Sequence, residues 1–447
     1  MPLGSARVFV CVSAAVVLLG GMRPAGQRTG LPIEEVVARR QALMREVGHG
    51  LVVLFGNERQ EGAGHFAQDN DFYYLTGRDD ANAILVMAPK SGQSFLFLPE
   101  QNPREIMIEG ANLLKDPHAA EVAGVTAVHP LTYFDEFLAR NLVSNGLELH
   151  VRLSPHDTVA GARYESALMV ARRSRIHYND QLPIDQYRLV KLRERYPAAT
   201  LRDVTPLVDA MRVIKTPAEI TVMRRNGQIS AEGVRQAMLA SRPGVFEYEI
   251  EAAAMGYVLK RGARGPAYAP IVGSGPNTCV WHYDDNGRQA EAGDLVLMDF
   301  GAQLDHLTMD ITRTWPVSGK FTQEQRRVYE QVLEVEKACI DAYRPGVTEA
   351  DVKRAVADAL KRKGIDAGGL EGGFGHHVGL ATHDVGAIDR LREGMVFAIE
   401  PALYFPDKQI GIRVEDTVLI TRDGCEVLTR GVPKEIAEIE ALLATRR

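Results

Sequence analysis

The chain has few cysteines, no excess of positive charge and no serine-hydrolase signature, and each absence excludes a class of function. The four cysteines, Cys11, Cys279, Cys339 and Cys425, are widely spaced, which argues against a disulfide framework and a CxxC zinc site. A formal net charge of -6 gives no basic footprint, so nucleic acid is not expected as a partner. There is no G-x-S-x-G motif and no cysteine in an activating setting, which disfavours a serine or cysteine nucleophile.

Long hydrophobic runs are also scarce, and the one near the start is too short to span a membrane. Arg7 precedes the run VFVCVSAAVVLLGG, whereas a spanning helix needs roughly 20 apolar residues. A basic start, an apolar run and a small-residue region together are typical of a secretory signal. We therefore expect residues 1–26 to be a signal peptide and the protein to be exported, or periplasmic. The alternatives are an uncleaved anchor or a misassigned start, the latter leaving the protein cytoplasmic.

Length and composition favour two globular domains, since 447 residues exceed one ordinary core. Over residues 31–200, short apolar runs such as GLVVLFGN and NAILVMAP alternate with helical patterns such as IEEVVARRQALMREV. This alternation predicts an α/β domain, in which DFYYLTG is interpreted as core plus turn. Thr216, Pro217 and Glu219 form a helix start with an N-cap, a first-turn proline and a capping glutamate. We place the boundary near residue 200 and the second domain at 201–447.

The second domain contains an internal repeat. RPGVFEYEIEAAAMGYVLKRGA, beginning at Arg242, matches RPGVTEADVKRAVADALKRKGI, beginning at Arg344. Each copy continues with a loop histidine and, at the same spacing, a strand carboxylate, pairing His282 with His383 and Asp299 with Glu400. A second acid follows in each half, Asp310 in LTMDITRT and Glu415 in GIRVEDTVLI. The repeat predicts two fused αβ halves around a pseudo-two-fold axis.

The four repeat-related acids predict a metal site. Their neighbours are largely apolar, and ionised carboxylates cannot converge in a core without compensating cations. Arg313 and Arg413 lie nearby, but Arg413 shares a strand face with Glu415 and offsets only part of the charge. Two divalent cations would balance the four carboxylates. Structural ion pairs remain the alternative for any single acid.

A histidine is expected to complete the metal site. The glycine-rich segment GGFGHHVGLATHDVG offers His376, His377 and His383 as candidates. A set of oxygen ligands with one imidazole favours manganese or cobalt over a thiolate-type zinc site.

These motifs resemble the pita-bread metallopeptidases, and within them the aminopeptidase P type. The resemblance spans roughly residues 31 to 446 and is carried by VGSGPNTCVWHYDDNGR, LVLMDFGAQLDHLTMDITRTWPVSGKFT and GIRVEDTVLITRDGCEVLT. It implies an α+β chain in which a creatinase-type α/β domain precedes a pita-bread catalytic domain. It also implies that Asp299 binds one metal ion, that His376 and Glu400 bind the other, and that Asp310 and Glu415 bridge both.

The resemblance further implies the roles of the remaining site residues. His282 and His383 match non-ligand histidines that face the scissile bond, Arg413 matches an arginine that supports the bridging glutamate, and Glu400 matches the proposed base. His377 occupies a variable position. Two departures from the family pattern concern the rim of the substrate site: Gly372 replaces a frequent histidine, and the segment YFPDKQIG is short.

The expected activity is removal of an N-terminal residue that precedes proline, with two divalent metal ions, most simply Mn²⁺ with Co²⁺ or Zn²⁺ as alternatives. The partners are then peptides with proline at the second position and further copies of the chain, as a dimer or tetramer. A prolidase restricted to Xaa-Pro dipeptides would share the metal site. A non-catalytic peptide-binding protein on the same fold is the third alternative, and the intact ligand set disfavours it.

Overall fold

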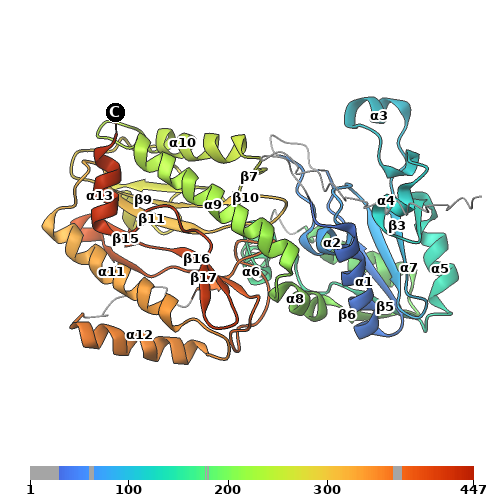
Figure 1. The fold of residues 1–447 in the computed structure, drawn as a ribbon. Helices are drawn as coiled ribbons and strands as arrows, with labels where there is room; N and C mark the ends of the chain where they lie inside the picture. Colours follow the sequence, from blue (N-terminus) through green and yellow to red (C-terminus); the bar gives the residue numbers. More distant parts are fainter. Residues whose placement is uncertain (1–29, 60–64, 177, 179–180, 366–374, 447) are drawn as a thin grey trace, which may run out of the picture.

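The computed structural model describes residues 30–59, 65–176, 178, 181–365 and 375–446. The N-terminal part, blue to cyan in Figure 1, lies beside the C-terminal part, yellow to red. The expected signal peptide at residues 1–26 lies outside the described residues. Within the described ranges, no helix combines the length and apolar character needed to cross a membrane.

The N-terminal part is built on one mixed sheet with the strand order β4-β3-β2-β1-β5-β6. Antiparallel β1–β2 and β2–β3 pairs lie between parallel β3–β4, β1–β5 and β5–β6 pairs. The strands are β1 Leu51–Phe55, β2 Ile84–Ala88, β3 Gln93–Leu98, β4 Ala127–Pro130, β5 Glu148–Val151 and β6 Thr200–Asp203. Its helices are α1 Ile33–Val47, α2 Asn70–Thr76, α3 Pro103–Glu109, α4 Ala119–Ala123, α5 Phe134–Leu142, α6 Arg163–Arg173 and α7 Ile184–Arg195. The predicted α/β alternation is present.

Both faces of this sheet are covered because its central strands are apolar on both sides. Val52 and Leu54 pack with α1 and α2, while Leu51 and Val53 pack with α5 and α7. DFYYLTG, interpreted above as core plus turn, forms the short buried helix α2 and the glycine that ends it. Asp69 caps its start, and Gly77 ends it in the left-handed conformation with φ of 63°.

The first sheet ends just beyond the boundary placed at residue 200. Thr200–Asp203 pairs with β5 as the edge strand β6, and α8 Thr205–Val213 then leads into the second part. α9 Pro217–Ala240 begins as predicted, since the Thr216 hydroxyl accepts from the Glu219 N–H and the Glu219 carboxylate accepts from the Thr216 N–H.

The C-terminal part shows the predicted repeat as two similar halves. In the first half, α9 and α10 Glu247–Lys260 pack on an antiparallel sheet of order β11-β9-β8; in the second, α11 Gln323–Ala342 and α12 Glu349–Lys363 pack on a sheet of order β12-β13-β16-β17. The strands are β7 Gly265–Pro266, β8 Ile271–Ser274, β9 Leu295–Phe300, β10 Ala302–Gln303, β11 Ile311–Pro316, β12 His376–His377, β13 Val396–Ile399, β14 Ala402–Phe405, β15 Ile410–Arg413, β16 Asp416–Ile420 and β17 Cys425–Val427. α13 Ile436–Ala444 closes the chain beside α9.

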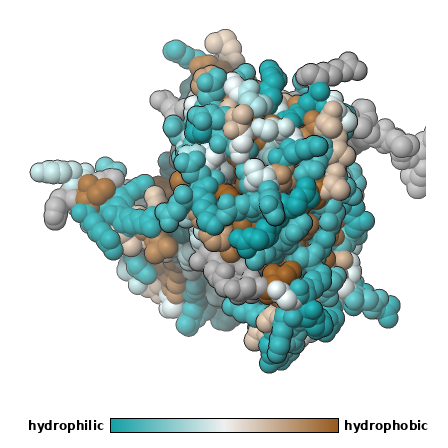
Figure 2. Space-filling model, turned by 90° about the vertical axis from the view of Figure 1, so that its left-hand side faces the viewer, coloured by the Kyte–Doolittle hydropathy of each residue, from teal (hydrophilic) through white to brown (hydrophobic). Residues whose placement is uncertain are grey.

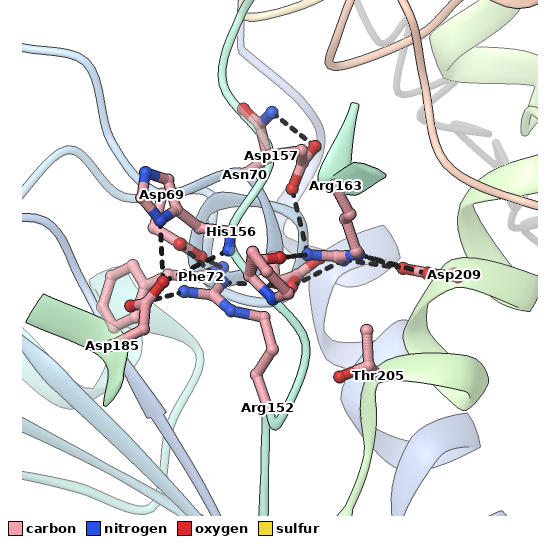
Figure 3. Close-up of polar contacts among 12 residues, drawn as sticks. Asp69, Asn70, Phe72, Arg152, His156, Asp157, Arg163, Asp185, Thr205 and Asp209 are labelled. Carbon is pink, nitrogen blue, oxygen red and sulfur yellow. Dashed lines mark hydrogen bonds and ion pairs between the residues drawn. The ribbon is translucent and has the colours of Figure 1, made fainter. Parts of the chain in front are cut away.

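A buried ionic network joins the two parts. Figure 3 shows Arg152 between Asp69 and Asp185, and Arg163 between Asp157 and Asp209. Burial alone would raise the pKa of the Asp71 carboxyl, but Arg163, Arg212 and Arg152 outweigh it and hold that pKa well below its usual range. Arg212 also pairs with Asp384 at 2.6 Å, so the network fixes α6 and α8 against the second part of the chain.

Hydrophobic side chains on one end of the molecule are scattered. On the face shown in Figure 2, hydrophilic residues predominate and hydrophobic ones form small separate patches. Among the residues described on that face, there is no broad apolar surface that would indicate a docking site.

Candidate metal centre

The predicted metal ligands converge from both halves of the repeat. Asp299 lies within β9, and Asp310 immediately precedes β11, which pairs with β9. His376 begins β12, Glu400 immediately follows β13, and Glu415 stands between β15 and β16. Strand ends from two sheets therefore bring together five residues that are far apart in the sequence.

The geometry of the cluster fits a divalent cation. Ligand atoms of Asp310, His376 and Glu415 all lie within 4.8 Å of one another. His376 Nε2 lies 3.6 Å from Asp310 Oδ2 and 3.5 Å from Glu400 Oε1. Glu415 is buried, and its Oε1 atom has no hydrogen-bond partner. An unpaired buried carboxylate oxygen is costly, and a cation would satisfy it.

The electrostatics of the cluster lead to the same conclusion. Burial first, and then the Asp299 charge, raises the pKa of Asp310 well above its usual value, while burial and the Asp310 charge do the same for Glu415. Burial, with a smaller effect of His383, lowers the pKa of His376 to about 3, which keeps the imidazole neutral and able to ligate. The clustered carboxylates therefore lack enough positive charge around them, and divalent metal ions would supply it.

Arg413 is the guanidinium that contacts the acids: it pairs directly with Asp299 and reaches Glu415, the partner implied by the resemblance, through one hydroxyl. Its Nη2 donates to Asp299 Oδ2, and its Nε donates to the Thr312 hydroxyl, which in turn donates to Glu415. Arg313, considered above as a second compensating cation, instead pairs with Asp416 at 2.7 Å. One arginine cannot neutralise four carboxylates.

A cavity of about 830 Å³ opens from this centre. Four of the predicted ligands, Asp299, Asp310, His376 and Glu400, line its inner end, while Glu415 is buried and does not line it. The outer part follows α6 and the start of α7, where Met169, Val170 and Leu189 line the wall. A volume of this size is typical of a small-molecule or peptide site rather than a single-residue pocket.

The two repeat histidines both line the cavity. His383 packs against the predicted ligand His376, with ring centroids 4.1 Å apart, and its Nδ1 lies 2.8 Å from a carboxylate oxygen of Glu165. His282 stands in an exposed turn on the cavity wall. His377, the variable position, is buried and stacks on Phe397, and it does not line this cavity. Gly372 lies outside the described residues.

Sequence reasoning missed two site residues. The Tyr268 hydroxyl lies within hydrogen-bond distance of carboxylate oxygens of both Asp299 and Asp310, and its single hydrogen can be donated to one of them at a time. Glu165 reaches the site from the other part of the chain. Tyr268 lies in an ordinary loop sequence, and Glu165 reads as a helix-capping residue, so neither carries a local signal.

Comparison with known proteins identifies the class and then the family. The model of metallopeptidase family M24 matches residues 221–422, and that of the aminopeptidase P N-terminal domain matches residues 36–150. The Xaa-Pro aminopeptidase of Escherichia coli (strain K12) is 35% identical, over 93% of this chain and 98% of that protein. The Xaa-Pro aminopeptidase of Haemophilus influenzae is 32% identical, over 92% and 98%.

Comparison with solved structures finds the same family as comparison of the sequences. Zn-substituted E. coli aminopeptidase P in complex with product superimposes with a TM-score of 0.78 at 33% identity, covering 94% of this chain and 100% of that one. The same enzyme with the inhibitor Pro-Leu gives a TM-score of 0.78 at 32% identity, covering 93% and 99%. The chain belongs to metallopeptidase family M24, with an aminopeptidase P N-terminal domain. It is a metallo-exopeptidase that uses divalent metal ions and acts on peptides, and the expected pita-bread fold is confirmed.

Proposed function

We propose that this protein is a two-metal aminopeptidase that hydrolyses the bond between the first residue of a peptide and a following proline. The observation that carries the proposal is the convergence of Asp299, Asp310, His376, Glu400 and Glu415 at the inner end of a cavity. Oxygen ligands with one imidazole favour Mn²⁺, with Co²⁺ or Zn²⁺ as alternatives. Relatives named Xaa-Pro aminopeptidase support the substrate assignment.

Metal ions at this site would polarise the scissile carbonyl and lower the pKa of water. Glu400 lies at the cavity surface within the ligand set, where its carboxylate would accept the proton of the attacking water. His282 and His383, on the cavity wall, would contact the carbonyl oxygen and the leaving nitrogen. Arg413 would hold Asp299 in its ligating position.

The shape and surface of the cavity support a peptide longer than a dipeptide. Its wall continues past the metal centre along α6 and α7, which would leave room for residues beyond proline. Trp281 and Tyr164 offer exposed aromatic surfaces to this cavity. An amide before proline has no N–H, so a site that recognises ring shape suits it better than one that requires a hydrogen-bond donor.

The test is to load metal-free protein with Mn²⁺ and measure release of the first residue from Xaa-Pro-Xaa, Xaa-Pro and Xaa-Ala-Xaa peptides. We expect metal-dependent cleavage of the Xaa-Pro-Xaa peptides, two metal ions per chain, and no cleavage by the Asp310→Asn variant. Cleavage of dipeptides alone would instead assign a prolidase. Two bound metal ions without cleavage of any peptide would overturn the substrate assignment and leave the metal site standing.

We also propose export and self-association, which rest on the first residues of the sequence and on the family resemblance. Mass spectrometry of the protein from the exported fraction would show a new N-terminus near residue 26 if a signal peptide is removed. Retention of Met1 in the cytoplasm would contradict export. Sedimentation at low concentration would test the expected dimer or tetramer.

A further inference from the structure

The loop that carries His383 is built against the N-terminal part of the chain. The backbone N–H of Thr382 donates to the Val159 carbonyl oxygen at 2.8 Å. On the other side of His383, the Asp384 carboxylate accepts from Arg212 at 2.6 Å and from Lys215 at 3.1 Å. These contacts fix the backbone on both sides of the histidine, so the rotation and tautomer of its ring depend on what the side chain contacts.

Glu165 makes the side-chain contact that decides the rotation and tautomer of the His383 ring. It stands at the third position of α6, where its Oε2 accepts from the Ala162 N–H at 2.7 Å, which is the glutamate half of a capping box. Its Oε1 lies 2.8 Å from His383 Nδ1. Because the cap holds one carboxylate oxygen in place, the second is presented to the histidine from a rigid helix end.

The chemistry of the pair fixes the tautomer. A carboxylate only accepts hydrogen bonds, so His383 Nδ1 carries the hydrogen and Nε2 is the ring nitrogen left for the substrate. The His376 ring packs edge-on against the His383 ring, with an interplanar angle of 62°. His282, in contrast, has no hydrogen-bond partner among the described residues. The two histidines of the cavity therefore differ in what orients them.

We propose that Glu165 is a positioning residue for His383: it holds the imidazole with Nδ1 protonated, so that Nε2 meets the substrate as a hydrogen-bond acceptor. This proposal rests on the proposed function for its kinetic consequences. A free Nε2 can take up the proton that the attacking water gives to Glu400 and then donate it to the leaving proline nitrogen, which has no N–H of its own. The carbonyl oxygen requires a hydrogen-bond donor and is left to His282. Through Glu165, the N-terminal domain contributes to the chemistry as well as to the cavity wall.

The central variant is Glu165→Gln. Its amide oxygen can still accept from the Ala162 N–H, which leaves the amide NH₂ group facing His383 Nδ1 and favours the opposite tautomer. The matched control is Glu249→Gln, because the exposed Glu249 makes the same one-sided cap at the start of α10, accepting from the Phe246 N–H at 2.9 Å.

We expect kcat of Glu165→Gln to fall by about 10- to 100-fold on an Xaa-Pro-Xaa peptide, as loss of an orienting partner typically does, with KM, metal content and Tm close to wild type. Glu249→Gln should match wild type in all four. In a His383→Ala background, Glu165→Gln should cause no further loss. Unchanged kcat, or a further loss in that background, would overturn the proposal, since Glu165 would then act independently of His383.

A second readout does not depend on turnover. In protein loaded with diamagnetic Zn²⁺ and labelled with nitrogen-15 histidine, His383 should show the Nδ1–H tautomer, assigned by its absence from His383→Ala. Glu165→Gln should shift that signal towards the Nε2–H tautomer, and Glu249→Gln should not. An Nε2–H tautomer in the wild type would overturn the proposal. If no Xaa-Pro peptide is cleaved, the proposed function fails and this measurement still decides the role of Glu165.

Discussion

Arg413 and Glu415 are two positions apart in the chain, yet they meet through the hydroxyl of a third residue, Thr312. The Arg413 Nε donates to Thr312 Oγ1 at 3.0 Å, and that hydroxyl donates to Glu415 Oε2 at 2.6 Å. All three side chains are buried. The Thr312 hydroxyl on the neighbouring strand thus connects Arg413 to Glu415, a predicted metal ligand, and orients its carboxylate.

Thr312→Val should weaken metal binding, because the variant keeps the side-chain shape and removes the hydroxyl that orients Glu415. Loss of such a supporting contact typically costs about 10–100-fold in metal affinity. The control is Thr314→Val, whose hydroxyl donates to the Arg413 carbonyl oxygen instead. Competition with a fluorescent chelator measures both. Equal affinity of the two variants would contradict this role of the Thr312 hydroxyl.

His383→Ala should lose turnover and keep its metal, because His383 lines the cavity but is not among the predicted ligands. We expect a fall in kcat of about 100-fold or more, as for other acid–base or polar contacts at a reacting bond. Metal content by mass spectrometry should equal wild type, whereas Asp310→Asn should lose metal. A metal-depleted His383→Ala protein would show that the histidine holds the site together instead.

Gly375→Ala should unfold the turn that delivers His376. Gly375 has φ of 78°, and a Cβ there would lie 1.5 Å from the Ala398 carbonyl oxygen. The left-handed backbone costs about 1–2 kcal/mol and the clash about 1–3 kcal/mol more. Gly244→Ala is the control, since Gly244 has φ of 90° with open space around it. Urea unfolding should show the larger loss at Gly375, together with loss of metal.

Glu336→Gln should flatten the pH dependence of stability. Burial, and then the Asp416 charge, raises the pKa of Glu336 to about 8 from 4.5, so the folded protein keeps a proton that the unfolded chain releases. Stability from this group is therefore present below pH 4.5 and lost as pH rises through about 8, by a few kcal/mol.

Glutamine cannot ionise, so the Glu336→Gln protein should lose less stability than wild type between pH 5 and pH 9. Glu330→Gln on the exposed side of α11 serves as the control and should follow wild type. Denaturant midpoints across that pH range provide the measurement. Parallel profiles for the wild type and Glu336→Gln would show that Glu336 is ionised in the folded protein.

Much of this protein was determined by local pattern in the sequence. The capped start at Thr216, the apolar runs of the first sheet and the repeated helices each follow from a few adjacent residues, and each is present. The repeat also placed acids at equivalent strand positions, because a period of two fixes which face of a strand a residue occupies. The convergence of those acids followed from their apolar surroundings.

Only the tertiary structure decided which side chains meet across elements. Arg313 and Arg413 both lie near the acids in the sequence, but the tertiary structure pairs Arg313 with Asp416 and Arg413 with Asp299. Glu165 reads as a helix cap, and its contact with His383 exists only because the ionic network docks α6 against the second half of the chain. Periodicity fixes the face of an element, whereas partners from distant segments depend on how whole elements pack, which no local pattern encodes.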